Sequence, residues 1–185
     1  MSLIETMFQT KAVRMGPSRH DPSRQVATFV PEAIRALHEA RTAELQQFGW
    51  LPGEWSYENA VPATRVSPAY TDVGVVRFAF NGDGTWICMI GRDERPVPLI
   101  TFDPWSRLWM YVLTNGSYGI LRSTGWDGDR ITFTGTMTML GVTCEWRMTW
   151  EKAGLEEFAF VNEEQGADGR WNYIDHWRYR RKHAI

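Results

Sequence analysis

The feature of this sequence that most constrains its fold is the spacing of its turn signals. From Trp55 onward, short runs of aromatic and β-branched residues are interrupted at near-regular intervals by clusters of Gly, Asn, Asp and Ser. These clusters are Asn81-Gly82-Asp83-Gly84, Asn115-Gly116-Ser117, Asp127-Gly128-Asp129 and Ala167-Asp168-Gly169. Turns of this chemistry join antiparallel strands that are neighbours in sequence. A long meander of such strands tends to close into a barrel, because closure removes the exposed edges.

The runs between these turns predict about ten strands. Their ranges are 54–60, 71–80, 85–91, 97–102, 107–113, 118–125, 130–138, 142–151, 156–163 and 171–180. No long linker interrupts them, and the residue pattern does not repeat in identity as it would in a propeller or solenoid. The sequence therefore predicts an all-β fold: one domain over residues 49–185, built as a closed antiparallel barrel of 8–10 strands.

The residues before the strands divide into an arm and a helix. Residues 1–30 show no hydrophobic period, which predicts an arm that is either mobile or laid over a surface. Residues 31–48 predict one N-terminal helix, because Pro31 suits the first helical position and Gly49 suits the position just past the end. We expect this helix to close one barrel end or to pack on the wall. Its apolar face consists of Ile34, Leu37, Ala40, Leu45 and Phe48.

The predicted strand 107–113 is apolar on both faces. One face carries Leu108, Met110 and Val112, and the other carries Trp109, Tyr111 and Leu113. A barrel wall of this kind needs a cover on its outer side, which the helix 31–48 or a second subunit could supply. We therefore expect a homodimer, with the arm or the outer wall at the interface.

Composition and charge exclude several function classes. The net charge of −2 provides no basic field for nucleic acid. No apolar run of about 18 residues is present, so no membrane-spanning helix is expected. Cys88 and Cys144 lie inside predicted strands and form neither a metal-binding spacing nor a disulfide framework. Free thiols in a reducing compartment are then expected, which points to a cytoplasmic protein without a metal site.

The segment Gly53-Glu54-Trp55 at the first strand resembles the opening of lipocalin-like (calycin) barrels. This resemblance implies that Trp55 packs at the closed end of the barrel, under an arginine from the last strand. Arg178 or Arg180 is expected to play that part. A guanidinium over an indole is a cation–π contact worth roughly 0.5–2 kcal/mol.

Residues 49–180 resemble the DUF1579-type lipocalin-like proteins, a bacterial family of uncharacterised function. The resemblance rests on the order of several short motifs. These are Gly53-Glu54-Trp55, Phe102-Asp103-Pro104, Gly125-Trp126-Asp127-Gly128, Arg147-Met148-Thr149-Trp150, and Gly169-Arg170-Trp171 leading to Tyr179-Arg180. The family implies a barrel with, at most, a pocket for a small ligand, and it implies no catalytic residues. Residues 1–48 depart from it.

Aromatic residues supply the candidate ligand site. The chain is 14% aromatic and contains ten tryptophans, most of which we expect in the core. A subset near strand middles is predicted to line a cavity, with two polar groups as anchors. The predicted ligand-binding residues are Trp86, Trp109, Tyr111, Trp146 and Tyr173, with Arg147 and His176 as the polar groups. The expected function is binding of a small apolar or aromatic molecule inside the barrel, without a cofactor.

Two alternative functions stay open. Haem-binding barrels of the nitrobindin type share this architecture and use a histidine near the C-terminal strands, a position that His176 could fill. Such a site requires His176 to point inward. A cyclase or isomerase acting on an apolar substrate would need an inward Glu145, Arg147 or His176 with a perturbed pKa. For Glu145 and Arg147, which share one strand face, an ion pair on the outer surface is the favoured interpretation.

Overall fold

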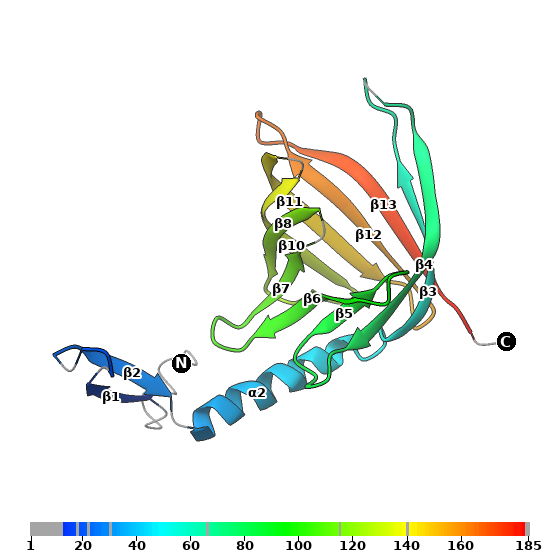
Figure 1. The fold of residues 1–185 in the computed structure, drawn as a ribbon. Helices are drawn as coiled ribbons and strands as arrows, with labels where there is room; N and C mark the ends of the chain where they lie inside the picture. The colour runs from blue at the N-terminus through cyan, green and yellow to red at the C-terminus, as the bar shows by residue number, and fades with distance from the viewer. Residues whose placement is uncertain are drawn as a thin grey trace.

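A closed antiparallel barrel dominates the structure (Figure 1). The computed structural model describes residues 13–17, 19–21, 23–29, 31–65, 67–114, 116–139 and 141–183. The strands that follow the helix are β3 Gly53–Val61, β4 Tyr70–Phe80, β5 Ile87–Ile90, β6 Pro96–Asp103, β7 Leu108–Leu113, β8 Ser117–Ser123, β9 Trp126–Asp127, β10 Arg130–Met139, β11 Val142–Lys152, β12 Glu157–Gln165 and β13 Trp171–Arg181.

Hydrogen bonding joins these strands into a ring. The order is β11-β12-β13-β3-β4-β5-β6-β7-β8-β10, and the pairing of β10 with β11 closes it. The two-residue strand β9 adds to the end of β10 by a short antiparallel pairing. Ten strands of the described chain therefore form the barrel, as the turn spacing predicted. The prediction succeeded because most pairings in the ring join strands that are consecutive in sequence. The two exceptions are the pairing of β13 with β3 and that of β8 with β10.

The segment before the helix contains a hairpin that the sequence analysis did not predict. Its strands are β1 Val13–Pro17 and β2 Gln25–Phe29, which pair antiparallel as a separate two-stranded sheet. Figure 1 shows this hairpin, in blue, beside the N-terminal end of the helix and away from the barrel wall. The first of these strands ends in Gly16-Pro17, a pair typical of turns, so the sequence pattern predicted no strand there. Residues 1–12 of the predicted arm lie outside the described residues.

The predicted helix is present as α2 Pro31–Leu45, followed by the 3-10 turn η1 Gln46–Phe48. Its predicted apolar face is wrong at the N-terminal end, where Ile34 is 56% exposed. Figure 1 shows that the first turns of α2 project past the barrel toward β2, so that face has little to pack against there. The C-terminal end is buried through Leu45 and Phe48, and Arg41 Nε donates a hydrogen bond to the Phe102 carbonyl at 2.9 Å. No described helix combines the length and apolar character that a membrane span requires.

Trp55 is fully buried at the barrel end that η1 covers. The cation above its ring belongs to Arg181, whose Cζ lies 4.3 Å from the ring centroid, so the expectation of Arg178 or Arg180 was wrong. The reason is strand parity. Trp55 and Arg181 are register partners across β3 and β13, so their side chains share the inner face. Arg178 and Arg180 face outward, where they lie near Glu58 and Glu157.

Arg181 also satisfies backbone carbonyls that the chain turns leave unpaired. Its guanidinium donates to the carbonyls of Pro52 at 3.0 Å and Leu155 at 3.2 Å, and to that of Trp50. The indole Nε1 of Trp55 donates to the Leu51 carbonyl at 2.8 Å. One cation thereby connects the entry to β3, the β11–β12 turn and the last strand.

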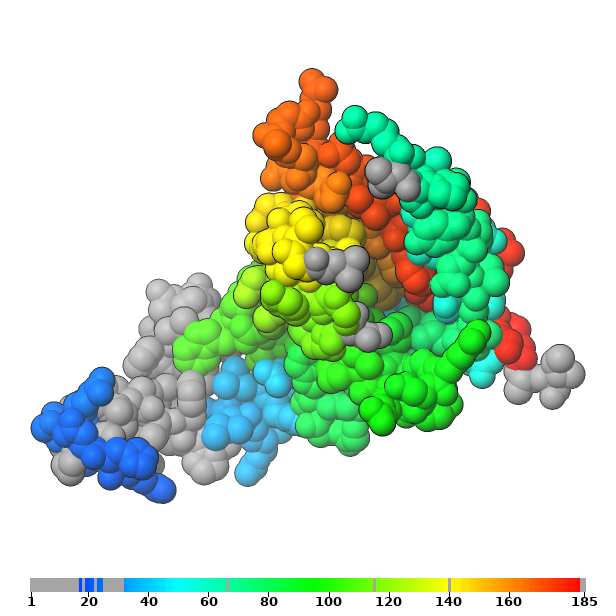
Figure 2. Space-filling model, turned by 45° about the horizontal axis from the view of Figure 1, so that its top comes forward, coloured from blue at the N-terminus to red at the C-terminus, as the bar shows by residue number. Residues whose placement is uncertain are grey.

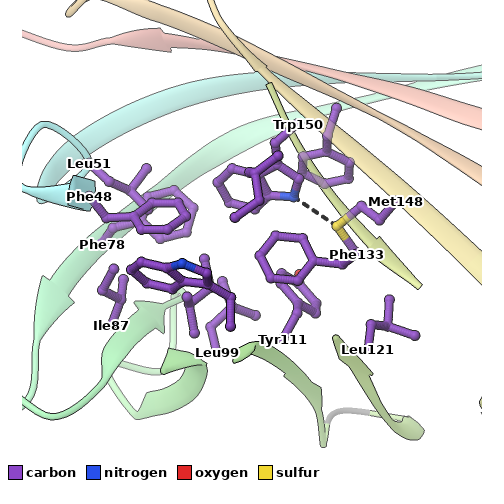
Figure 3. Close-up of a cluster of buried hydrophobic side chains, with 14 of the residues drawn as sticks. Phe48, Leu51, Phe78, Ile87, Leu99, Tyr111, Leu121, Phe133, Met148 and Trp150 are labelled. Atoms are coloured by element: carbon purple, nitrogen blue, oxygen red, sulfur yellow. Dashed lines mark hydrogen bonds between the residues drawn. The ribbon is translucent and has the colours of Figure 1, made fainter. Parts of the chain in front are cut away.

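Aromatic side chains fill the half of the barrel nearest this closed end (Figure 3). The Trp150 ring stacks on Phe158 and Phe160 at centroid distances of 5.1 and 5.3 Å, and its Nε1 donates to Met148 Sδ. Tyr111 packs against Phe133 at 5.7 Å, and burial raises the pKa of its hydroxyl. This half of the barrel is a solid core.

We predict that Arg181→Ala lowers the free energy of unfolding by about 3 kcal/mol, because it removes charge-assisted hydrogen bonds and a cation–π contact. Arg178→Ala, which removes an exposed cation of the same strand, should change that free energy by at most about 0.5 kcal/mol. Urea denaturation followed by tryptophan fluorescence measures both. Equal losses in the two variants would contradict the assignment of Arg181 as the capping residue.

Candidate functional site

The barrel wall splits at the end opposite η1. Pairing between β3 and β13 runs from Trp55 and Arg181 to Ala60 and His176 and stops there. Beyond that point Trp171–Asp175 pairs with β12 alone. The β3–β4 hairpin therefore separates from β13, and a hollow of about 480 Å³ lies at the separation. It is lined by Ala60, Val61, Pro62, Ala69, Tyr70, Thr71 and Tyr173.

The same hairpin is also free on its other side. β4 pairs with β5 only over Arg77–Phe80, so Tyr70–Val76 has β3 as its single neighbour in the sheet. Figure 2 turns this end toward the viewer and shows the surface hollowed between the hairpin and the β10–β12 wall. We call this region, from the split to the top of the aromatic core, the mouth of the barrel.

A chain of hydrogen bonds between buried polar side chains lies on the inner face at the base of the mouth. Trp146 Nε1 donates to Asn162 Oδ1 at 3.1 Å, and Asn162 Nδ2 donates to Asp175 Oδ1 at 2.8 Å. These residues come from β11, β12 and β13, whose register places them side by side. The chain explains how an amide that is only 7% exposed is tolerated in a barrel interior.

One further polar atom beside this chain, the buried Asn59 Oδ1, lacks a hydrogen-bond partner. Asn59 and Trp177 are register partners across β3 and β13, one position below the end of their pairing. The buried Trp177 Nε1 lies close enough to Asp175 to act on its pKa. An unpaired buried polar group costs roughly 1–3 kcal/mol, so Asn59 Oδ1 calls for a partner outside the packed core.

The carboxyl group of Asp175 is electrostatically perturbed. Burial is the largest influence and raises its pKa above the ordinary value of 3.8. Hydrogen-bonding groups of Asn162, Trp177 and Asn59, and the nearby His176, act in the opposite direction without cancelling it. A partly buried acid with a raised pKa is a physical marker of a candidate functional site.

Two other carboxylates share this inner face. Asp72 is the register partner of Asn59 and accepts a hydrogen bond from the Tyr57 hydroxyl at 3.2 Å. Glu164 is the register partner of Trp146. Burial raises the pKa of the Cys144 thiol, and the charge of Glu164 raises it further. The mouth therefore combines carboxylates, amides and aromatic rings.

Gly74 makes room for one of those rings. An added Cβ at Gly74 would lie 2.6 Å from the hydroxyl oxygen of Tyr57 and 2.7 Å from its Cζ. The ring of Tyr57 therefore lies against the bare backbone of β4 on the inner face. A larger residue at position 74 would push the Tyr57 ring away from the wall.

The predicted site residues divide between the two faces and the two ends of the barrel. Trp109 and Tyr111 face inward but belong to the packed core, where Trp109 is 2% exposed. Trp146 faces inward and joins the polar chain of the mouth. Trp86 lies in the connection between β4 and β5 and is half-buried. Only Trp146 of these four therefore belongs to the mouth.

The remaining three predicted residues lie on the outer face. Arg147 forms a two-point ion pair with Glu163, at 2.6 and 2.8 Å, and lies 4.5 Å from the ring centroid of Trp171. Tyr173, the register partner of Glu163, is 49% exposed and lines the outer side of the hollow. His176 alternates with the inward Asp175 and Trp177, and burial lowers its pKa. These residues do not converge with Trp146.

The preferred interpretation of Glu145 and Arg147 as surface residues agrees with their positions, but their partners differ from the expected ones. Glu145 accepts a hydrogen bond from Thr136 Oγ1 at 2.7 Å, and Arg147 pairs with Glu163 rather than with Glu145. Asn59, Asn162 and Asp175 were missed. A signal was present, since Asn162 continues the inward series that begins with Phe158 and Phe160.

Neither cysteine is in a disulfide. Cys88 is buried, and burial raises the pKa of its thiol. Over the described ranges, no group of three or more His, Cys, Asp or Glu side chains is arranged to hold a metal ion.

Comparison with known proteins shows the fold alone. No family model matches the sequence, and no curated protein matches it. Among solved structures the chain is similar to Rv2717c from M. tuberculosis, with a TM-score of 0.50 and 13% identity over 76% of this chain and 98% of that one. A redesigned β-barrel also matches, with a TM-score of 0.36 and 14% identity over 73% of this chain and 94% of that one. At 13% identity the likeness to Rv2717c shows the barrel fold alone.

We predict that Asp175→Asn removes a pH-dependent component of stability. The pKa of Asp175 in the folded protein lies above 3.8, so the unfolded chain gives up this proton first as pH rises. The parent therefore loses this component of stability between pH 3.8 and the raised pKa. The variant keeps an acceptor for Asn162 but has no proton to lose, so it should be as stable as the parent or more stable at pH 7. Urea midpoints measured between pH 3.5 and pH 7 test this, with the exposed Asp127→Asn as a control. A parent-like decline in Asp175→Asn would show that another group causes it.

Proposed function

We propose that this barrel binds a small molecule with an apolar or aromatic body in its mouth. The observation that carries the proposal is the buried, unpartnered Asn59 Oδ1 beside the indole of Trp177, at the base of the split wall. These two groups lie above a closed aromatic core, where a ligand would meet the rings of Trp146 and Trp177 on one side and polar groups on the other. Apolar lining with a few convergent polar groups is the usual pattern of a ligand site.

Acid–base catalysis on the bound molecule is the second candidate, and Asp175 is the observation that favours it. Its inward position and raised pKa are what a general acid requires. The residues first considered for this role, Glu145, Arg147 and His176, occupy outer-face positions. The haem alternative required an inward His176, and strand alternation turns that side chain away from the interior, so we do not propose haem binding.

We test ligand binding by titrating the neutral dye N-phenylnaphthylamine and following its fluorescence. Trp177→Ala should weaken dye affinity at least tenfold, about 1.4 kcal/mol, because it removes an inward ring of the mouth. Trp171→Ala is the matched control, since it removes an outward tryptophan from the same strand. Circular dichroism must first show that both variants fold. Absence of dye binding to the parent, with no molecule retained in native mass spectrometry, would refute the proposed function.

We also propose that the protein is a homodimer of the DUF1579-type lipocalin-like class and cytoplasmic. The support for a dimer is the unpaired edge of β4, on which Val73 and Val75 are 64% and 43% exposed. Free edges with exposed valines favour pairing with another chain.

Light scattering at micromolar concentration should therefore give twice the chain mass of 21.4 kDa. Val75→Lys, which places a charge at the edge, should shift the mass toward the monomer, while Thr138→Lys on β10 should not. A parent that scatters as a 21.4 kDa particle would contradict the dimer.

A further inference from the structure

The inner face of the mouth is acidic. Asp72, Glu164 and Asp175 contribute carboxylates from three different strands. On the strands as described, no lysine or arginine turns inward above the aromatic core: Arg122, Arg147 and Arg178 occupy positions that alternate with inward Leu121, Trp146 and Trp177. Burial and Asp72 raise the pKa of Tyr57, and Arg92, on the exposed β5–β6 turn, opposes that rise without cancelling it. The charged side chains on the inner face of the mouth are therefore carboxylates.

Aromatic faces accompany these carboxylates. Tyr57, Trp146 and Trp177 lie on the same inner face, and Tyr57 and Trp177 contact each other at a centroid distance of 5.2 Å. Indole and phenol faces attract cations, and the attraction increases when water is excluded. Carboxylates together with aromatic faces form the environment that recognises an organic cation.

The unpartnered acceptor Asn59 Oδ1 is an independent observation that points the same way. Asn59 is only 6% exposed, and it lies on the inner face between Asp72 and Trp177. Its oxygen requires a hydrogen-bond donor. A primary ammonium offers three donors and no acceptor, so one such group can serve Asn59 and a neighbouring carboxylate together.

We infer that the ligand of the mouth is an organic amine, a primary ammonium on an apolar or aromatic body, with Asn59, Asp175 and Asp72 around its charged end. This inference rests on the proposed function. A metal ion is a poorer fit to the same residues, because no group of three metal-binding side chains converges in the described chain. An anionic ligand would face three like charges.

Three naphthalene probes of similar shape and different charge test the inference: naphthylmethylammonium, naphthylmethanol and naphthoate. Isothermal titration at pH 7.5 should show the ammonium binding at least tenfold more tightly than the alcohol, with naphthoate weakest, since each 1.4 kcal/mol of charge preference is tenfold in affinity. Asp175→Asn and Asp72→Asn should each reduce the ratio of ammonium to alcohol affinity while leaving the alcohol affinity within about twofold. Glu163→Gln, which removes an outward carboxylate, should leave the ratio unchanged.

The outcomes separate the inference from the proposed function. Alcohol binding equal to or tighter than ammonium binding overturns the inference and leaves small-molecule binding standing. Failure of all three probes at millimolar concentration, together with failure of the neutral dye, counts against the proposed function itself. An ammonium preference that persists in the Asp72→Asn, Asp175→Asn double variant places the cation elsewhere and overturns the assignment of these carboxylates.

Discussion

The contact between Arg181 and Trp55 is the interaction on which the rest of the structure depends. The guanidinium covers the indole, and its hydrogen bonds hold carbonyls from the entry to β3 and from the β11–β12 turn. This arrangement positions η1 so that Phe48 enters the barrel end and contacts Trp109 at a centroid distance of 5.0 Å. The closed end is then continuous with the aromatic core.

Closure at one end determines where polar groups can be tolerated. Along the inner face of β12 the residues change from Phe158 and Phe160 to Asn162 and Glu164 as the strand rises from the core to the mouth. On β13 the same change runs from Tyr179 through Trp177 to Asp175. The boundary between apolar and polar positions falls at the same height on both strands. Packing alone would favour apolar residues at these positions, and the hydrogen bonds that join Trp146, Asn162 and Asp175 are what let polar ones occupy them.

The barrel could be predicted from the sequence because its information is local: turn residues, alternation and the proximity of consecutive strands in the ring. The errors arose at positions where the register between strands decides which face of the barrel a side chain occupies. Neighbouring residues of a strand point to opposite faces, so an error of one residue puts Arg180 in the place of Arg181. The register between β12 and β13 also shifts at Asn162 and Glu163, and this bulge places Tyr173 and Asp175 on opposite faces. No local pattern reveals a bulge of that kind. The helix was located through Pro31 and Gly49, but the exposure of its first turns depends on where the barrel ends.

The difference between the outer and inner carboxylates explains why the candidate site escaped the sequence analysis. Glu163 and Asp175 are both acids on neighbouring strands, yet Glu163 meets a guanidinium on the outer surface, whereas Asp175 meets amides and an indole inside. In the sequence each is one polar residue in an alternating strand. Only the pairing of β12 with β13, and of β13 with β3, gives Asp175 its buried neighbours Asn162 and Asn59. The chemistry of the mouth is therefore a property of strand register, and a change that moved β13 by one residue would remove it while leaving the composition of the chain unaltered.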